Sequence, residues 1–283
     1  LHESCYIKEL VSGSTGFLHL KHLISNYDQM EEELISSLNK IGELLFNQHN
    51  SFFSITAEQN DILTANPIID NIFQNLNFKK LPKQNIKMNL NLGNDALITS
   101  AEIVYAVQTG KIFNSEIDYK GSFEVLKSYL GNEYLHEKIR AQGGAYGCFP
   151  IFDSITRILS FVSYRDPNVK STFEAYNNIP NAIKNINISE RALEQLIIRT
   201  YGNFDPLLNP YMQGLIARNR YLTGNTKEFL VKIISEIEST TIQDLKNYLG
   251  QIQDFTNNSV RSIIGNKSKI QSNKNLFDKL IQL

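Results

Sequence analysis

The fold of this chain is decided by the run Leu-His-Glu-Lys-Ile-Arg-Ala-Gln-Gly-Gly-Ala-Tyr-Gly, which spans Leu135 to Gly147. An amphipathic helix ending in Arg140 leads directly into Gly143 and Gly144, and then into Tyr146. Glycine permits backbone conformations that side chains forbid, arginine donates a planar fork of hydrogen bonds, and a tyrosine hydroxyl can donate to an oxyanion. This set suits the gripping of an extended peptide. Spacing alone nevertheless favours a structural explanation, because helix–Gly-Gly–strand junctions also form for geometric reasons.

A second stretch, Ser163-Tyr164-Arg165-Asp166-Pro167-Asn168, follows the run, and Tyr129-Leu130 precedes it. In this order and at this distance, the stretches resemble the C-terminal region of the presequence-protease and falcilysin branch of the pitrilysin/insulinase zinc metallopeptidases. That branch carries a Leu-x-Glu-Lys-(Ile/Val)-Arg-x-Gln-Gly-Gly-Ala-Tyr-Gly segment, a hairpin, and then Ser-Tyr-Arg-Asp-Pro-Asn. The similarity extends more thinly from about residue 10 to the strand end at Ile263-Ile264-Gly265-Asn266.

The resemblance implies a pitrilysin-like (metallopeptidase-type) α+β fold, in which four homologous domains form two halves around a chamber. Residues 1–80 are then expected to be the helix-rich C-terminal part of a preceding domain, and residues 88–283 a complete C-terminal domain. Between them, lysines and Pro82 interrupt the apolar periodicity, so residues 81–87 are predicted to be a linker. The chain begins at Leu1 without a methionine, which favours a fragment of a longer polypeptide.

The pattern of residues also predicts the individual elements. Met30, Leu34, Leu38, Ile41 and Leu45 recur at helical spacing, which predicts a helix over 29–47. Further helices are expected after Pro67 and over 123–139, 168–184, 189–201, 210–222, 226–237 and 241–249, where Thr241 and Asp244 form a variant of the capping box. Strands are expected over 51–56, 88–92, 98–107, 145–152, 156–164 and finally 260–264, and a loop over 12–16. Beyond residue 88 this order favours α+β, with helices on one face of a mainly antiparallel sheet.

The resemblance also implies roles for residues of the Gly-Gly run. Tyr146 and Arg140 would reach a zinc site located elsewhere, Tyr146 to bind the scissile carbonyl as it becomes an oxyanion and Arg140 to hold substrate backbone or a zinc-side carboxylate. Gly143, Gly144 and Ala145 would form the substrate-binding turn that aims the tyrosine. The structural alternatives are a half-buried strand tyrosine and a cation that interacts with a helix dipole.

A zinc peptidase needs metal ligands and a carboxylate that activates water. The superfamily uses an inverted His-x-x-Glu-His motif, which is not found around His2, His19, His22, His49 or His136. His136-Glu137-Lys138-Ile139-Arg140 begins like His-Glu-x-x-His, but the cationic Arg140 occupies the second histidine's place. We therefore predict no metal ligands in this chain, zinc in the full-length enzyme, and no activity of the chain alone.

Composition limits the partners and the compartment. Lys+Arg 28 against Asp+Glu 29 gives a net charge of −1, which argues against nucleic acid and anionic membranes as partners. No apolar run approaches the roughly 20 residues that span a bilayer, and no signal peptide opens the chain, so secretion is not expected. Cys5 and Cys148 are the two cysteines, and reduced thiols favour the cytoplasm or an organelle matrix.

Three hypotheses for function follow. The leading one is the C-terminal, non-zinc part of a zinc metalloendopeptidase that degrades unfolded peptides, with this part supplying chamber wall and substrate contacts. The second is a stand-alone non-catalytic subunit that partners a separate zinc-bearing chain. The third is a structural or peptide-binding module without an enzymatic partner. A zinc motif upstream in the same reading frame would exclude the third.

Overall fold

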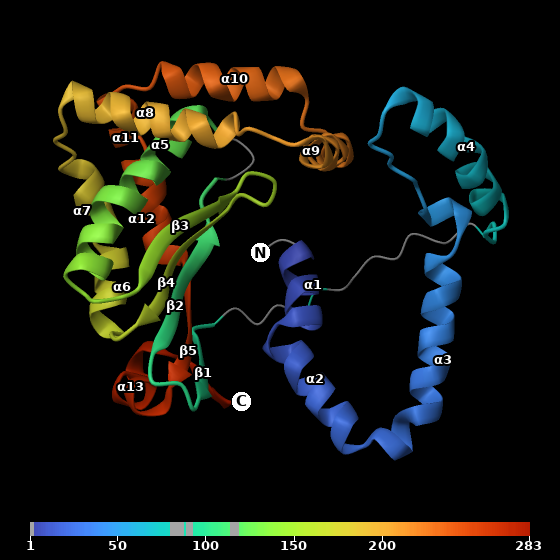
Figure 1. The fold of residues 1–283 in the computed structure, drawn as a ribbon. Coiled ribbons are helices and arrows are strands. Elements are labelled where there is room, and N and C mark those ends of the chain that lie inside the picture. The colour runs from blue at the N-terminus through green and yellow to red at the C-terminus, as the bar shows by residue number, and fades with distance from the viewer. Residues whose placement is uncertain (1–2, 80–87, 89–92, 114–118) are drawn as a thin grey trace. The chain divides into compact units, whose positions relative to one another are not determined.

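The computed structural model describes residues 3–79, 88, 93–113 and 119–283 of the chain. The chain divides into two compact units, whose elements are drawn in Figure 1. The first unit combines Leu1–Tyr6, Asn89–Pro206 and Glu228–Leu283, and the second combines Ile7–Met88 and Leu207–Lys227. The predicted linker at 81–87 lies outside the described residues, as does the predicted strand at 88–92 apart from Met88.

The first unit is built on a six-stranded sheet in the order β3-β4-β2-β5-β1-β6. The strands are β1 (Asp95–Thr99), β2 (Val104–Lys111), β3 (Gly147–Asp153), β4 (Ile158–Asp166), β5 (Val260–Asn266) and β6 (Lys279–Gln282). The pairs β3–β4, β4–β2 and β2–β5 are antiparallel, whereas β5–β1 and β1–β6 are parallel. The sheet is therefore antiparallel where it carries the Gly-Gly run, and β3 is its outermost strand on that side.

Helices gather on one side of this sheet (Figure 1). They are α5 (Gly121–Tyr129), the π-helix η2 (Leu130–Ala141), α6 (Lys170–Asn177), α7 (Ile179–Lys184), α8 (Glu190–Phe204), α10 (Lys227–Glu238), α11 (Ile242–Lys246), α12 (Leu249–Asn258), α13 (Lys267–Ser272) and the short η3 (Lys274–Leu276). In β2, the buried Val104, Ala106 and Gln108 alternate with the partly exposed Tyr105 and Val107. Since side chains alternate between the faces of a strand, one face of the sheet lies against the core.

Aromatic side chains fill the centre of that core. The ring of Phe113 lies 5.0 Å from that of Phe123 in α5, and the ring of Phe161 in β4 lies 5.3 Å from that of Phe255 in α12. All four side chains are 1% exposed or less. Burial of one such side chain contributes about 1.5–3 kcal/mol to stability, so these contacts hold α5 and α12 onto the sheet that carries the site.

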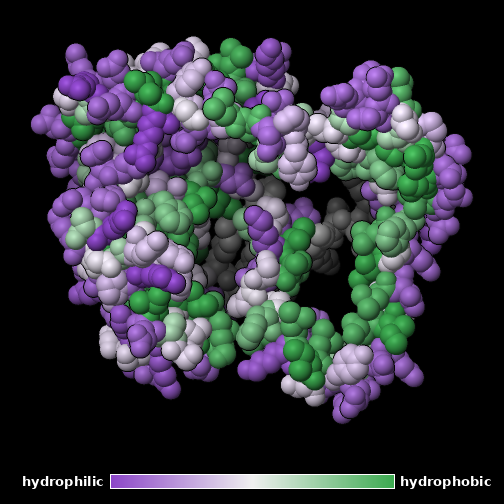
Figure 2. Space-filling model, in the orientation of Figure 1, coloured by the Kyte–Doolittle hydropathy of each residue, from purple (hydrophilic) through white to green (hydrophobic). Residues whose placement is uncertain are grey.

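The second unit is helical. Its helices are α2 (Ser14–Ser25), α3 (Tyr27–Leu45), η1 (Gln48–Asn50), α4 (Gln59–Gln74) and α9 (Pro210–Thr223), while α1 (Glu3–Ser12) contributes residues to both units. The fully buried Asn47 ties the end of α3 to the segment after α4, because its Nδ2 donates to the Lys79 carbonyl at 2.8 Å. Apolar side chains remain exposed along α3 and α4, among them Ile35, Leu38 and Ile68 (Figure 2).

Several predicted elements are confirmed. The helix expected over 29–47 is α3, the hairpin expected over 145–164 is β3 and β4, and the backbone and side chains of Thr241 and Asp244 make the reciprocal capping-box bonds. Other boundaries were wrong. Only Gly13 separates α1 from α2 in the expected loop, and the helix expected over 168–184 is divided at Asn178 into α6 and α7.

The larger errors concern strands and a proline. Residues 51–56 form no strand, and the ring of Phe53 instead packs on Phe73 of α4 at 6.0 Å. Pro67 does not begin a helix but lies inside α4. The strand expected over 98–107 is divided between β1 and β2, which are separated in the sheet by β5. The strand β5 is not the last one, because β6 follows it. Before β5, the helix α12 extends to Asn258.

Candidate functional site

The Gly-Gly run forms the C-terminal cap of η2. Its chain turns at Gly144, whose φ of 78° lies in the left-handed region that favours glycine. The N–H of Gly144 donates to the Arg140 carbonyl at 3.0 Å, and the N–H of Ala145 donates to the Ile139 carbonyl at 3.1 Å. A Cβ on Gly143 would lie 2.5 Å from the same Ile139 carbonyl, so a side chain there would displace the cap. Both glycines are therefore required by the turn.

This turn alternates a buried and an exposed side chain. Ala145 is 4% exposed and belongs to the core, which anchors the turn against the sheet. Tyr146, the next residue, is 67% exposed and its hydroxyl has no hydrogen-bond partner among the described residues. The structural alternative of a half-buried strand tyrosine does not describe this residue, which presents a free phenol to solvent.

Arg140 lies in the last turn of η2 and its side chain is exposed. It stands at one end of the glycine cap and Tyr146 stands at the other. No salt bridge of Arg140 occurs among the described residues. Its guanidinium fork is therefore available for a carboxylate or a carbonyl, and its position near a helix C-terminus is one that the helix dipole favours.

A β-bulge beside the turn brings further side chains to Tyr146. Val104 of β2 pairs with Asp166 of β4 and Ala106 pairs with Ser163, so Tyr164 and Arg165 together stand opposite Tyr105 alone. Such bulges often re-aim side chains next to active sites. Here the bulge turns the carbonyl of Arg165 toward Tyr146, whose N–H donates to it at 3.3 Å.

Three tyrosines and this arginine form one cluster on the exposed side. The ring of Tyr164 lies 5.7 Å from that of Tyr146 and 5.2 Å from that of Tyr105, in edge-to-face geometry. The Cζ of Arg165 lies 5.8 Å from the centre of the Tyr146 ring and 5.7 Å from that of Tyr164. We call Tyr105, Tyr146, Tyr164 and Arg165 the tyrosine–arginine cluster.

The loop after β4 braces the turn from behind. The Nδ2 of Asn168 donates to the Gly143 carbonyl at 2.6 Å. The loop is itself held by the fully buried Asp166, whose Oδ1 accepts from the Asn168 N–H at 2.8 Å and whose Oδ2 accepts from the Thr172 hydroxyl at 2.7 Å. The two sequence stretches that carried the resemblance are thus joined by direct hydrogen bonds.

Beneath the turn lies Cys148, the second residue of β3. Its thiol donates to the Leu135 carbonyl at 3.0 Å. Burial, reinforced by the nearby carboxylate of Asp166, raises the pKa of the Cys148 thiol to about 11. A thiol with a raised pKa is a poor nucleophile at neutral pH, so Cys148 packs under the site instead of reacting in it.

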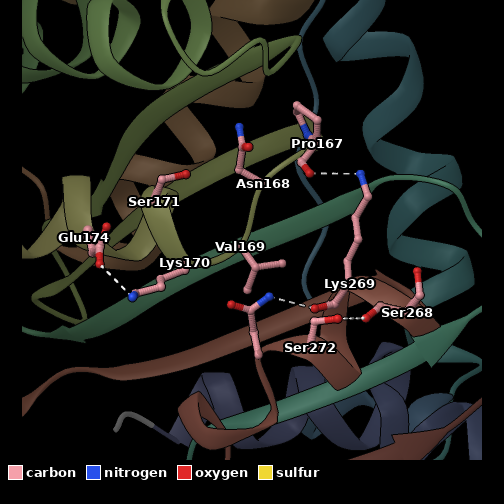
Figure 3. A pocket seen from close by; sticks show the side chains of 10 residues that line it. Pro167, Asn168, Val169, Lys170, Ser171, Glu174, Ser268, Lys269 and Ser272 are labelled. Atoms are coloured by element: carbon pink, nitrogen blue, oxygen red, sulfur yellow. Dashed lines mark hydrogen bonds and ion pairs between the residues drawn. The ribbon is translucent and has the colours of Figure 1, made fainter.

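Two pockets flank the bracing loop. One of about 300 Å³ lies between the end of η2 and the loop that follows β4, and its lining includes Gln142, Gly143 and Asn168. The other, of about 480 Å³, is shown in Figure 3 and lies between the start of α6 and α13. Its two lysines are engaged within the protein, because Lys170 lies 3.7 Å from Glu174 and the Nζ of Lys269 donates to the Pro167 carbonyl at 2.9 Å. The larger pocket therefore offers no unpaired lysine to a ligand.

The side chains of the site do not form a metal centre. Among the described residues, no three His, Cys, Asp or Glu side chains are grouped so that they could hold a metal ion. Nor does any described helix have the length and apolar character needed to cross a bilayer. The donor set of the described site consists of guanidinium, phenol and amide groups, which fit a peptide or an anion and do not fit zinc.

The sequence indicated Arg140, Gly143, Gly144, Ala145 and Tyr146, and the structure places all of them in one continuous turn. Four neighbours were missed, namely Tyr105, Tyr164, Arg165 and Asn168, although the last three lie in the second stretch that was matched. The signal available for them was only their presence in that stretch. Tyr105 carried none, because its contact with Tyr164 depends on the pairing of β2 with β4.

Comparison with known proteins gives the family context. Residues 94–268 match the family described as the PreP C-terminal domain. The chain is 31% identical over 269 residues to Protein HypA of Clostridium perfringens, covering 94% of this chain and 27% of that protein. It is 25% identical over 267 residues to presequence protease 1, chloroplastic/mitochondrial, of Arabidopsis thaliana, covering 93% of this chain and 24% of that protein. The chain thus spans about a quarter of the length of these curated relatives.

Solved structures agree at the level of the fold. The peptidase M16 inactive domain from Pseudomonas fluorescens matches with a TM-score of 0.52 at 10% identity, covering 75% of this chain and 52% of that chain. Identity this low shows the fold alone. The likeness confirms the pitrilysin-like α+β fold that the sequence predicts.

Proposed function

Because the chain belongs to the family of the PreP C-terminal domain, we propose that it is the C-terminal, non-zinc part of a peptide-degrading zinc metalloendopeptidase. In this proposal it supplies chamber wall and contacts to unfolded peptides. The zinc is held by the N-terminal half of the same polypeptide or by a separate subunit. The relatives named as presequence proteases support this substrate class, and they favour an organelle matrix or an equivalent reducing compartment.

The observation that carries the proposal is the presentation of Tyr146. A large aromatic side chain is 67% exposed at a turn whose backbone is fixed on both sides. A preorganised hydroxyl costs little reorganisation when charge develops on a substrate carbonyl. In the proposed enzyme, Tyr146 donates a hydrogen bond to that developing oxyanion, which stabilises the transition state more than the ground state.

Arg140 and the glycine cap complete the substrate contact. The exposed guanidinium of Arg140 holds a substrate carbonyl or a carboxylate through its planar fork. In the substrate-binding turn, Gly143 and Gly144 lack side chains that would keep a peptide away, while the buried Ala145 anchors the turn in the core. These roles rest on the position of the residues in one turn and on the absence of a salt bridge of Arg140 among the described residues.

The same proposal covers the domain arrangement. In it, residues 88–283 form the C-terminal domain, residues 81–87 the linker, and residues 1–80 the C-terminal part of a preceding pitrilysin-like domain. The compact units differ from this division, because Leu207–Lys227 groups with Ile7–Met88. The exposed apolar side chains of α3 and α4, such as Leu38 and Leu63, support this arrangement. Apolar surfaces of this kind are usually covered in the functional protein.

Replacement of one hydroxyl tests the proposal. In the zinc-bearing enzyme that contains this chain, Tyr146→Phe keeps the ring and removes the donor. Loss of one such donor costs about 3 kcal/mol in the transition state, so kcat should fall on the order of a hundredfold with KM little changed. The control is Tyr221→Phe, at a side chain that is 85% exposed on α9. Equal turnover by both variants would contradict the catalytic role.

A second experiment distinguishes a fragment from a natural subunit. The chain purified alone should contain far less than one zinc per molecule after dialysis and should not cleave unstructured peptides. If a zinc-bearing protein encoded by a separate gene co-purifies with it at native expression and cleaves peptides, the chain is a non-catalytic subunit. Stoichiometric zinc in the chain alone, with hydrolysis blocked by a chelator, would contradict both versions.

A further inference from the structure

Arg165 stands in a backbone conformation that favours another residue type. Its φ is 51°, and in the described chain the only other non-glycine residue with a positive φ is Arg157, at 60°. Arg157 lies in the turn between β3 and β4, where such conformations are common, whereas Arg165 lies inside β4 at the bulge. The left-handed position of a bulge is usually occupied by glycine. The backbone conformation at this position therefore does not explain why the residue is an arginine.

That side chain is directed at Tyr146 and Tyr164. Its Cζ lies 5.8 Å from the first ring centre and 5.7 Å from the second, within the range of a cation–π interaction. Arg165 forms no salt bridge within the part of the chain that the structure describes. The two tyrosine rings are therefore the partners of its charge.

The backbone of Arg165 holds the same tyrosine. The N–H of Tyr146 donates to the carbonyl of Arg165, the residue with the left-handed φ, at 3.3 Å. The Tyr146 ring also contacts the edge of the Tyr164 ring at 5.7 Å. One residue thus restrains both the main chain and the ring of an exposed tyrosine.

We infer that Arg165 is a positioning residue that fixes the direction in which the Tyr146 hydroxyl is presented to substrate. This inference rests on the proposed function of Tyr146 and adds a residue to it. Arg165 acts through the tyrosine, so its loss should reduce the transition-state contact without removing it. Substrate binding in the ground state should change little.

The test is made in the zinc-bearing enzyme with Arg165→Gly. Glycine removes the guanidinium and suits the left-handed backbone, so the melting temperature should stay close to that of wild type. An exposed cation–π contact corresponds to roughly a two- to fivefold effect, so kcat should fall about fivefold at most, with KM nearly constant. Arg165→Lys keeps a cation over the rings and should recover part of the loss.

The chain provides a matched control in Arg157→Gly. Arg157 also has a positive φ, and its Cζ lies 5.8 Å from the centre of a tyrosine ring, that of Tyr119. It shares the backbone strain and the cation–π geometry but belongs to a different contact. Its replacement should leave kcat at the wild-type value.

A spectroscopic readout follows the position directly. With 3-fluorotyrosine incorporated, the fluorine resonance of Tyr146 is identified by its disappearance in Tyr146→Phe. This resonance should shift in Arg165→Gly and remain in place in Arg157→Gly. A structural role that did not involve Tyr146 would leave it unmoved.

The outcomes separate this inference from the proposed function. The inference is supported if Arg165→Gly lowers kcat in the wild type but has no further effect on Tyr146→Phe. It is overturned if Tyr146→Phe is impaired while Arg165→Gly is not, and the proposed function then stands. A wild-type rate for Tyr146→Phe overturns the proposed function and this inference together.

Discussion

The side-chain amide of Asn168 donates a 2.6 Å hydrogen bond to the carbonyl oxygen of Gly143, across 25 positions of sequence. Each residue belongs to one of the two stretches that carried the family resemblance. The contact explains why the stretches occur together, because the loop after β4 holds the cap of η2 in the shape that exposes Tyr146. The turn that exposes Tyr146 and the loop that supports it are therefore encoded as a pair.

Replacing Asn168 tests this support. Asn168→Ala should lower the free energy of unfolding by about 1 kcal/mol, since it leaves a partly buried carbonyl unpaired, and should also reduce peptide turnover. Asn168→Asp should be worse, because it sets a carboxylate against the Gly143 carbonyl. Urea unfolding and steady-state kinetics measure the two effects. The control is Asn181→Ala, which removes an exposed 2.7 Å bond to Asn178 within the same unit. If Asn168→Ala matched this control in both assays, the bracing role would be wrong.

The cap itself can be tested at Gly144. Its φ of 78° strains any residue with a Cβ, so Gly144→Ala should cost about 1 kcal/mol of stability. Gly147→Ala is the comparison, because that glycine has no positive φ and a Cβ there would meet only the Phe149 ring, at 3.9 Å. Thermal unfolding of the two variants should show the larger loss at Gly144. Equal losses would show that the left-handed turn does not decide the cap.

The thiol of Cys148 should make stability depend on pH in the alkaline range. Its pKa rises from 9.0 to about 11 on folding, chiefly because of burial. The folded protein therefore keeps a proton that the unfolded chain loses above pH 9. The resulting stabilisation is complete below pH 9 and is lost as pH rises through about 11. Cys148→Ala should lose less stability than wild type between these values. Parallel curves for wild type and Cys148→Ala would contradict the assignment.

The capping box of α11 should contribute measurably. The Thr241 hydroxyl accepts from the Asp244 N–H at 3.2 Å, and the Asp244 carboxylate accepts from the Thr241 N–H at 2.9 Å. Thr241→Ala should cost about 1 kcal/mol. Thr256→Ala removes an exposed hydroxyl that donates to the Gln253 carbonyl within α12 and should cost less. Denaturant midpoints of the two variants decide the point.

Much of the fold follows from local patterns. The apolar residues of α3 repeat at helical spacing, so this helix was predictable. The β3–β4 hairpin was also predictable, because Asp153 begins a turn between two segments rich in strand-forming residues. The strands at 95–99 and 279–282 were not, because each pairs with segments far away in sequence, β1 with β5 and β6. The alternation over 98–107 also continues through the turn between β1 and β2, which hides the boundary. Phe52 and Phe53 have strand-forming side chains but find no strand to pair with.

The site divides in the same way. Arg140 and Tyr146 lie in one continuous run, so a sequence match is enough to single them out. Arg165 comes to Tyr146, and Tyr105 comes to Tyr164, through the register of β4 with β2 and β3, including a bulge of one residue. Register is a property of the assembled sheet. No local pattern in the sequence reports it, and only the folded chain shows that the arginine faces the tyrosine.

Pro150 lies in the middle of β3, the outermost strand beside the site. Proline has no N–H, and in sheets it is accommodated where that missing donor faces away from the neighbouring strand. A second strand that paired along this edge would therefore lack a hydrogen-bond donor at Pro150. Other polypeptides can contact Phe149 and Ile151, whose side chains are exposed, but they cannot extend the sheet by regular strand pairing. Pro150 thus protects this edge of the sheet against edge-to-edge aggregation with extended apolar polypeptides.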